Sequence, residues 1–237
     1  MFYKLSNTCD VLEIEKEFGT TFRYPNLYKP KAIIDGLKES QLPIITSQNL
    51  SHVDYSIWGL LPEGYDDNWN TFQDFTNTLN TNIQSNDLNE EIYSDSLDKR
   101  RCLVIVNGFF STKISDGKLR THLIHLKNQN PFCIAGIYNK ILDGFYTCSI
   151  LTTNSVCGND HIPGLEKQKP LIFKKKDLKR WLDPKLTIEH LKPLVQNHEH
   201  YDFISQPINE SFYNNSKLFS RTVNSSNEHH IMRISRD

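Results

Sequence analysis

RRCLVIVNGFF, residues 100–110, is the stretch from which we predict the fold of this chain. Two arginines precede a run of apolar and β-branched residues that stops at Asn107-Gly108. This pattern predicts a buried central strand over 102–106 that ends in a turn, where an α+β fold often presents a functional group. The residues just past that turn are Phe110, Ser111 and Thr112. None of them is an obvious acid, base or nucleophile.

Segments on both sides predict hairpins around this central strand, so the middle of the chain is expected to be a β-meander in an α+β fold. Turn sequences stand at 115–118 and 142–144. The predicted strands are 1–5, 42–46, 55–61, 102–106, 121–126, 132–138, 145–152, 170–173 and 203–209. The predicted helices are 11–18, 87–98, 176–182 and 187–196. Residues 19–41 and 66–81 read as loops, the second of them long and structured.

Length and charge favour one domain without a global electrostatic field. The 237 residues show no repeat and no linker, so we expect one domain over 1–210 and a polar tail over 211–237. With 27 basic and 28 acidic residues, any site for a polyanion must be a local patch. We expect a monomer.

The cysteines and the apolar runs indicate a soluble cytoplasmic protein. Five scattered cysteines form no Cys-x-x-Cys pair, which favours buried free thiols and a reducing compartment. No segment has the apolar length of a signal peptide or a membrane span. Histidines at 190, 198, 200, 229 and 230 lack cysteine or carboxylate partners at zinc-like spacing, so we expect no metal and no cofactor.

Several short motifs follow one another along the chain. They are Trp58-Gly59-Leu60-Leu61-Pro62, Leu79-Asn80, Arg100-Arg101-Cys102-Leu103-Val104, Gly108-Phe109-Phe110, Ala135-Gly136-Ile137, Thr152-Thr153 and Pro170-Leu171-Ile172 before Trp181-Leu182. In this order they resemble the SRAP family, the SOS response-associated peptidase or abasic-site processing proteins. The resemblance covers roughly residues 1–210.

The resemblance implies a compact α+β domain with a mixed, barrel-like β core, flanked by short helices. It also implies a positively charged cleft for single-stranded DNA beside a duplex. Family members resemble N-terminal nucleophile enzymes, in which removal of the initiator Met leaves a Cys with a free α-amine. The amine and thiolate capture the aldehyde of an abasic site as a thiazolidine. A Glu after the Gly-Phe-Phe motif, a His in a later loop and an Asn after the Trp-Gly strand assist.

This sequence departs from that pattern at the reactive positions. Phe2 stands where the nucleophilic Cys is expected, and Ser111 stands where the Glu is expected. The His position falls at Pro163, although His161 lies two residues earlier. Asn80 matches the family Asn. At other functional positions, Lys4 keeps a basic residue, Asn82 and Gln84 replace an Arg and a Glu, and Gln168-Lys169 replaces Arg-Met.

Two functions from different classes follow from these replacements. The first is a catalytically degenerate DNA-binding module, with nucleic-acid contacts at Phe2, Lys4, Asn80, Asn82 and Arg100. The second is an active abasic-site enzyme with a rebuilt site, in which an amine such as Lys4 or the N-terminus forms a Schiff base and Asn80 and His161 assist.

Ordinary structural roles compete with these interpretations. Asn80 also fits a loop residue that caps a turn, and His161 fits an exposed loop histidine. Cys157 with His161 is a further nucleophilic pair to weigh. The basic run 174–180 fits either a phosphate contact or the solvated start of a helix.

Overall fold

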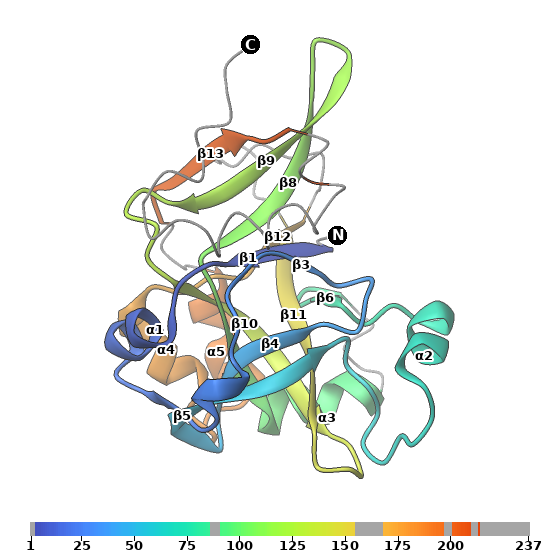
Figure 1. The fold of residues 1–237 in the computed structure, drawn as a ribbon. Coiled ribbons are helices and arrows are strands. Elements are labelled where there is room, and N and C mark those ends of the chain that lie inside the picture. Colours follow the sequence, from blue (N-terminus) through green and yellow to red (C-terminus); the bar gives the residue numbers. More distant parts are fainter. Residues whose placement is uncertain (1–2, 86–90, 155–167, 197–200, 210–212, 214–237) are drawn as a thin grey trace.

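The computed structural model describes residues 3–85, 91–154, 168–196, 201–209 and 213, which form two β-sheets with short helices around them (Figure 1). The α+β fold class and the single domain predicted from the sequence are confirmed. The bounds 1–210 and 211–237 stay a prediction, because most residues after 209 lie outside the described part.

Strands β5, β4, β7, β10 and β11 form a closed ring, which is the barrel-like feature that was expected. Neighbours in the ring pair antiparallel, except that β11 pairs parallel with β5, as in Cys148 opposite Trp58. The bounds are β4 (Gln41–Thr46), β5 (Asn49–Trp58), β7 (Arg101–Val106), β10 (Phe132–Lys140) and β11 (Tyr146–Asn154). Three short strands extend it at its edges: β2 (Thr21–Phe22), β6 (Asn80–Asn82) and β12 (Gln168–Pro170). The predicted central strand is confirmed, since every residue of β7 is buried.

The second sheet, called the upper sheet below, has the strand order β13-β9-β8-β1-β3. Its bounds are β1 (Lys4–Asn7), β3 (Lys31–Asp35), β8 (Gly108–Ser115), β9 (Lys118–Leu126) and β13 (Phe203–Pro207). Strand β3 lies inside residues 19–41, so the loop predicted there is wrong at these positions.

The predicted turn at Asn107-Gly108 is wrong, because the chain runs there from β7 in the ring straight into β8 in the upper sheet. Asn107 links this crossing to Thr8, the residue that follows β1. Its side-chain amide donates to Thr8 Oγ1 at 2.6 Å and accepts from the Thr8 N–H at 3.2 Å. Gly108 is required by close approach, since a Cβ would lie 2.8 Å from Leu123 Cδ1 and 3.1 Å from the Ile124 carbonyl oxygen. The dipeptide therefore marks a change of sheet.

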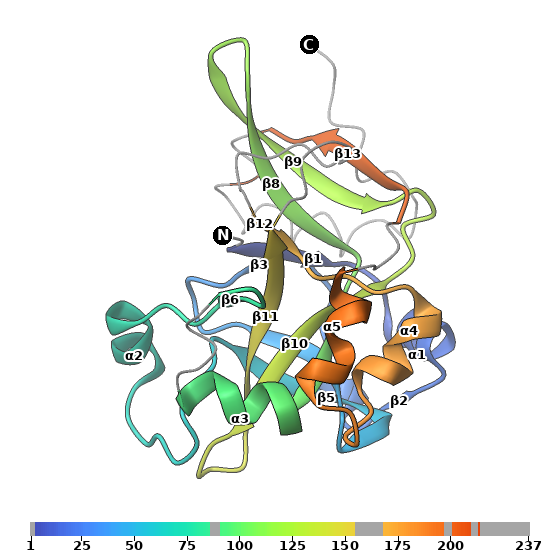
Figure 2. The ribbon, with the colours of Figure 1, turned by 180° about the vertical axis from the view of Figure 1, so that it is seen from behind.

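The four predicted helices are present, with their ends shifted by a few residues. Helix α1 (Val11–Phe18) begins at a capping box between Asp10 and Glu13 and ends at Gly19, whose φ of 65° suits glycine. The others are α3 (Glu91–Lys99), α4 (Lys175–Trp181) and α5 (Ile188–Gln196), and a 3₁₀ turn spans Pro25–Leu27. Figure 2 shows α3, α4 and α5 on one side of the ring.

Helix α2 (Trp69–Phe75) lies inside the segment predicted to be a loop, so that prediction is wrong. Asn68 caps the helix by accepting from the N–H groups of Asn70 and Thr71. Trp69 and Gln73, four residues apart, are its buried residues. Gln73 belongs to a buried polar contact with Thr78, whose hydroxyl accepts from its Nε2 at 2.8 Å. Because so few residues of this helix are buried, its sequence shows almost no helical hydrophobic periodicity, and the helix could not be predicted from it.

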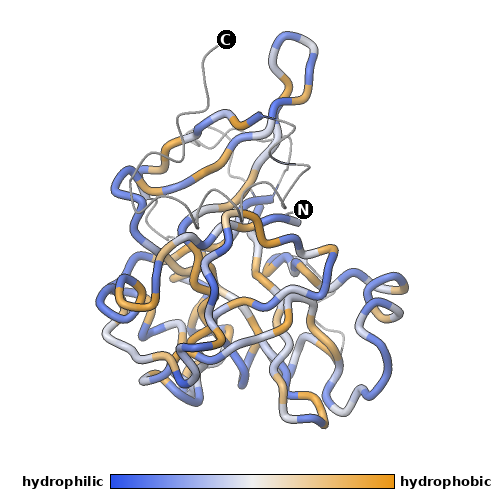
Figure 3. Tube along the Cα trace, viewed as in Figure 1, coloured by the Kyte–Doolittle hydropathy of each residue, from blue (hydrophilic) through white to orange (hydrophobic). Residues whose placement is uncertain are grey.

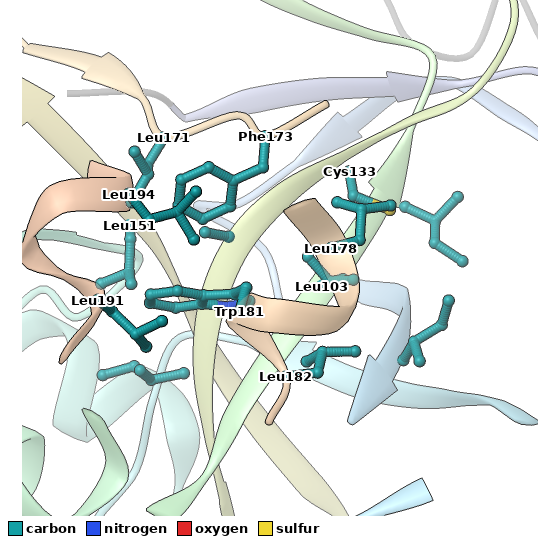
Figure 4. Close-up of a cluster of buried hydrophobic side chains, with 14 of the residues drawn as sticks. Leu103, Cys133, Leu151, Leu171, Phe173, Leu178, Trp181, Leu182, Leu191 and Leu194 are labelled. Atoms are coloured by element: carbon teal, nitrogen blue, oxygen red, sulfur yellow. The ribbon is translucent and has the colours of Figure 1, made fainter. Parts of the chain in front are cut away.

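Apolar residues recur along the strands and helices (Figure 3), and their buried side chains form two large clusters. Trp181 lies fully buried at the centre of the cluster under α4 and α5, and its Nε1 donates to the Cys102 carbonyl at 2.9 Å (Figure 4). Leucines and Phe173 surround the indole, with the Phe173 ring centroid at 5.4 Å. The neighbours labelled around it are Leu103, Leu151, Leu171, Leu178, Leu182, Leu191 and Leu194.

Arg101 is buried completely beside this cluster, and it ties the ring to the helices. Its guanidinium donates five hydrogen bonds of 2.6–2.9 Å, all to backbone carbonyls. The acceptors are Leu97, Asp98, Trp181, Asp183 and Leu186. Burial lowers the pKa of Arg101, while Asp98 and Asp183 act in the opposite direction. All five N–H donors of the guanidinium are thereby satisfied.

Candidate functional site

The family-related positions on β6 and β12 flank the end of β11 on its two sides. Asn80 pairs with Ile150 and Asn82 with Thr152, in parallel register. From the other side, Gln168 pairs with Asn154 in antiparallel register. Asn80 therefore stands in a strand, which corrects the interpretation of a loop residue capping a turn. Its position is set by Leu79, whose carbonyl accepts from Trp58 Nε1 at 2.8 Å.

Neutral amide side chains gather around the end of β11, and three of them are joined by hydrogen bonds. We call Asn82, Gln84, Asn154 and Gln168 the amide cluster. Asn82 donates from Nδ2 to Asn154 Oδ1 at 2.9 Å and accepts the Gln84 N–H at 2.9 Å. Gln84 Oε1 accepts the Asn154 N–H at 2.9 Å, and Gln168 Oε1 accepts from Thr152 Oγ1 at 3.0 Å. Hydrogen bonding thus holds the edge where the family resemblance implies an Arg and a Glu.

The upper sheet meets this edge through one shared core. Leu5, Phe109 and Ile124 of the upper sheet pack in the same cluster as Leu79 and Ile150. We call the face of the upper sheet that carries Leu5 and Phe109 its inner face. The sheet junction is the region where this face meets β6, β11 and β12.

Ser111 lies on the inner face, because side chains alternate along a strand and Phe109 stands two residues before it. It is buried, at 3% exposure. Directly opposite stands His122, whose Nδ1 lies 2.9 Å from Ser205 Oγ. Burial, and to a lesser extent Lys113, lower the pKa of His122 below its usual value. A neutral imidazole therefore lies across from the position where the family resemblance implies a carboxylate.

Lys4 lies on the opposite, outer face of the upper sheet, since its neighbour Leu5 is on the inner face. Its Nζ donates to the Tyr213 carbonyl at 2.9 Å and lies 3.9 Å from the centroid of the Tyr213 ring. That ring packs edge-on against Phe110 at 5.5 Å. The amine of Lys4 is therefore engaged on the face turned away from Ser111.

Arg100 lies at the start of β7, at the opposite end of that strand from the crossing at Asn107. Its Nε donates to Asn139 Oδ1 at 3.0 Å, and its Nη1 lies 3.6 Å from Glu63 Oε2. The structure thus places Asn80 and Asn82 on β6 beside β11, Ser111 on the inner face of the upper sheet, and Arg100 at the opposite end of β7. Phe2, His161, Pro163 and Cys157 lie outside the described residues.

The thiols that the structure describes are all buried. Burial raises the pKa of Cys9 and Cys148 to about 12. It raises the pKa of Cys102 and Cys133 well above the ordinary value. Since the thiolate is the nucleophile, none of these four cysteines replaces the family Cys.

The described residues lack two further features. They contain no group of three or more His, Cys, Asp or Glu side chains placed to hold a metal ion. Among their helices, none combines the length and the apolar composition needed to cross a bilayer.

The sequence profile of the SOS response associated peptidase (SRAP) family matches residues 3–215. The chain belongs to the SRAP family. Among curated protein sequences, none matches. Membership supports an association with the SOS, or DNA damage, response.

Solved structures share the SRAP fold of this chain at low sequence identity. A protein from Bacteroides thetaiotaomicron has a TM-score of 0.77 and 21% identity over 90% of this chain and 94% of its own. A protein from Bordetella bronchiseptica has a TM-score of 0.70 and 14% identity, over 87% and 99%. A phage-related protein from the same organism has a TM-score of 0.64 and 14% identity, over 88% and 94%. The overlap extends over nearly the whole of each chain.

Two features of the sheet junction were not predicted from the sequence. His122 belongs to an alternating strand and carries no motif of its own. The amide cluster depends on the register of β6 against β11, which joins residues about 70 positions apart. The replacements at Asn82, Gln84 and Gln168 were visible in the sequence, but their mutual contacts were not.

Proposed function

We propose that this chain is a degenerate SRAP protein that binds single-stranded DNA, or single-stranded DNA beside a duplex, at the sheet junction without forming a covalent crosslink. The observation that carries the proposal is Ser111, a buried hydroxyl at the family's acid position, together with Phe2 at the nucleophile position. A phenylalanine supplies no thiol for a thiazolidine, and its bulk favours retention of Met1.

The surroundings of this position support a binding role over a covalent one. The buried cysteines are poor nucleophiles, because burial disfavours their thiolates. The amine of Lys4 is held by Tyr213 on the outer face. The amide cluster offers donors and acceptors to base edges without a charge, and aromatic stacking on Phe2 would suit an unpaired base.

The test is a crosslinking assay with single-stranded DNA that carries one abasic site. Wild type is treated with borohydride, which would reduce an imine to a stable amine, and binding is followed separately by fluorescence anisotropy. We expect binding without an adduct. The matched variant Phe2→Cys, with removal of Met1 checked by mass spectrometry, is expected to give a crosslink on a denaturing gel.

Each alternative outcome has a distinct meaning. A borohydride-trapped adduct in wild type would establish the rebuilt enzyme, with the N-terminal amine or Lys4 as the nucleophile. Absence of DNA binding in wild type would overturn the proposal altogether. A variant Phe2→Cys that folds but does not crosslink would show that the sheet junction no longer receives an abasic site.

A further inference from the structure

The β8–β9 hairpin projects from the body of the molecule and carries a different chemistry on each face (Figure 1). Its strands pair in the order Ser111 with His122, Lys113 with Arg120, and Ser115 with Lys118. Residues directly opposite each other share a face, and every second residue returns to it. These pairs therefore all lie on the inner face, the same face as the sheet junction.

Beyond the core, this inner face becomes cationic. We call Lys113, Lys118 and Arg120 the cationic hairpin face. Lys118 and Arg120 are exposed and Lys113 is half-buried. Within the described residues, none of the three forms an ion pair with a carboxylate. The chain as a whole has a net charge of −1, so these charges form a local positive patch.

The arrangement of these charges does not serve the stability of the hairpin. Lys113 stands directly opposite Arg120, and a like-charge pair across two strands is unfavourable by roughly 0.2–1 kcal/mol. A turn through Asp116 and Gly117, both with positive φ, already fixes the hairpin. An unfavourable pair of like charges that adds nothing to the stability of the hairpin is expected where the residues serve a function.

The outer face of the same hairpin contrasts with it. Ile114 and Leu119 pair there, with 61% and 57% of their surfaces exposed. Figure 3 shows polar and apolar residues mixed along this hairpin. The cations are thus confined to the face that leads to Ser111 and His122.

We propose that the cationic hairpin face binds successive phosphates of a single-stranded nucleic acid and leads the strand into the sheet junction. The inference rests on the proposed function and adds the path of the ligand. Lys118 and Arg120 stand two residues apart on β9 and are separated by about 7 Å, comparable to the step between phosphates in an extended strand, while Lys113 stands beside Arg120 on β8. Three phosphate contacts would contribute a salt-dependent part of the affinity.

The test measures the anisotropy of a fluorescein-labelled oligothymidylate with the full chain over a range of salt concentrations. The variant combines Lys113→Gln, Lys118→Gln and Arg120→Gln. The control combines Lys16→Gln, Lys140→Gln and Lys185→Gln, three exposed lysines off the hairpin, so that both variants lose the same charge. Thermal melts of both variants check that they fold.

We expect the hairpin variant to lose about tenfold or more in affinity. The slope of log K against log salt should become shallower by about 2, since each phosphate contact contributes about 0.7 on a single strand. The control should bind like wild type. Equal losses in both triple variants would overturn the inference and leave the proposed function standing.

Competitors identify the ligand class. A duplex of equal length and polyglutamate are expected to compete poorly with the labelled strand. If polyglutamate competes as well as oligothymidylate, the hairpin is a general anion surface and the inference is wrong. Wild type without affinity for oligothymidylate would overturn the proposed function and the inference together.

Discussion

The two ends of β7 lie in contrasting surroundings. At its start, Arg101 is buried under the helices, with every guanidinium N–H bonded to a backbone carbonyl. Its far end faces the sheet junction, which is lined by the amide cluster and the inner face of the upper sheet. One end holds a single charge in a fixed geometry. The other end carries the amide cluster, whose neutral side chains are partly or fully exposed.

This difference shows where substitutions can accumulate in an SRAP protein. At the Arg101 end, burial makes each donor and acceptor indispensable, because an unpaired polar group there has no water to replace its partner. At the sheet junction, Asn82 and Gln84 are partly or fully exposed, so solvent can satisfy them. The fold is therefore expected to depend strongly on the first end and weakly on the second.

Arg101→Met should have the largest effect on stability. It leaves five carbonyls without their donor, and we expect a loss of about 3–5 kcal/mol or failure to fold. Urea unfolding followed by circular dichroism measures it. The matched control is Arg100→Gln, which removes an ion pair with the exposed Glu63 and a hydrogen bond to Asn139, and we expect a smaller loss of about 1–2 kcal/mol. Similar losses in the two variants would remove the distinction between the neighbouring arginines.

Trp181→Phe tests the same end with a smaller change. The phenyl ring keeps much of the apolar contact but leaves the Cys102 carbonyl without the indole N–H. We expect a loss of about 1–3 kcal/mol in the free energy of unfolding, measured by urea titration. A neutral result would show that water or another donor reaches this carbonyl.

Asn82→Ala should show how little the fold depends on the sheet junction. The variant loses the hydrogen bonds to Asn154 and Gln84, both at an exposed edge, so we expect a loss below about 1 kcal/mol. Calorimetric melting is sufficient to measure it. A loss above about 2 kcal/mol would mean that the amide cluster is structural.

The smallest effect concerns the pKa of His122. Burial lowers it, and Lys113 adds to this, so Lys113→Gln should raise it. Between the lowered native pKa and the ordinary 6.5, the unfolded chain binds more protons than the native one. The contribution of His122 to stability should therefore be complete above 6.5 and decline as the pH falls. Titration of the imidazole signals by NMR measures this pKa in wild type and in the variant. An unchanged pKa in the variant would exclude the influence of Lys113.

The sequence predicts an element most clearly where a run of apolar residues or a capping motif marks it. Strand β7 and helix α1 are of this kind, with a buried run in one and capping residues in the other. Helix α2 and strand β3 were missed, since α2 is mostly polar and β3 follows Pro30 in a segment with loop composition. Asn107-Gly108 has the composition of a hairpin turn, and only the partner strands show that it connects two sheets.

The replaced residues at the site were predictable, but their surroundings were not. Phe2 and Ser111 could be identified by position against the family motifs. That Lys4 and Ser111 lie on opposite faces, and that His122 stands across from Ser111, depends on strand register. The turn at 115–118 sets the register of Ser111 against His122, whereas the place of Lys4 depends on the pairing of β1 with β8, which lie about 100 residues apart in the sequence.

The hydrogen bonds of Arg101 also constrain how the protein is made. Its acceptors include the carbonyl of Leu186, which is 85 residues further along the chain. At 5–20 residues per second, the ribosome needs roughly 4–17 s to add this stretch. Until then the guanidinium lacks the partners that permit its burial, so the nascent chain should stay open around β7. We therefore expect the domain to close only late in synthesis.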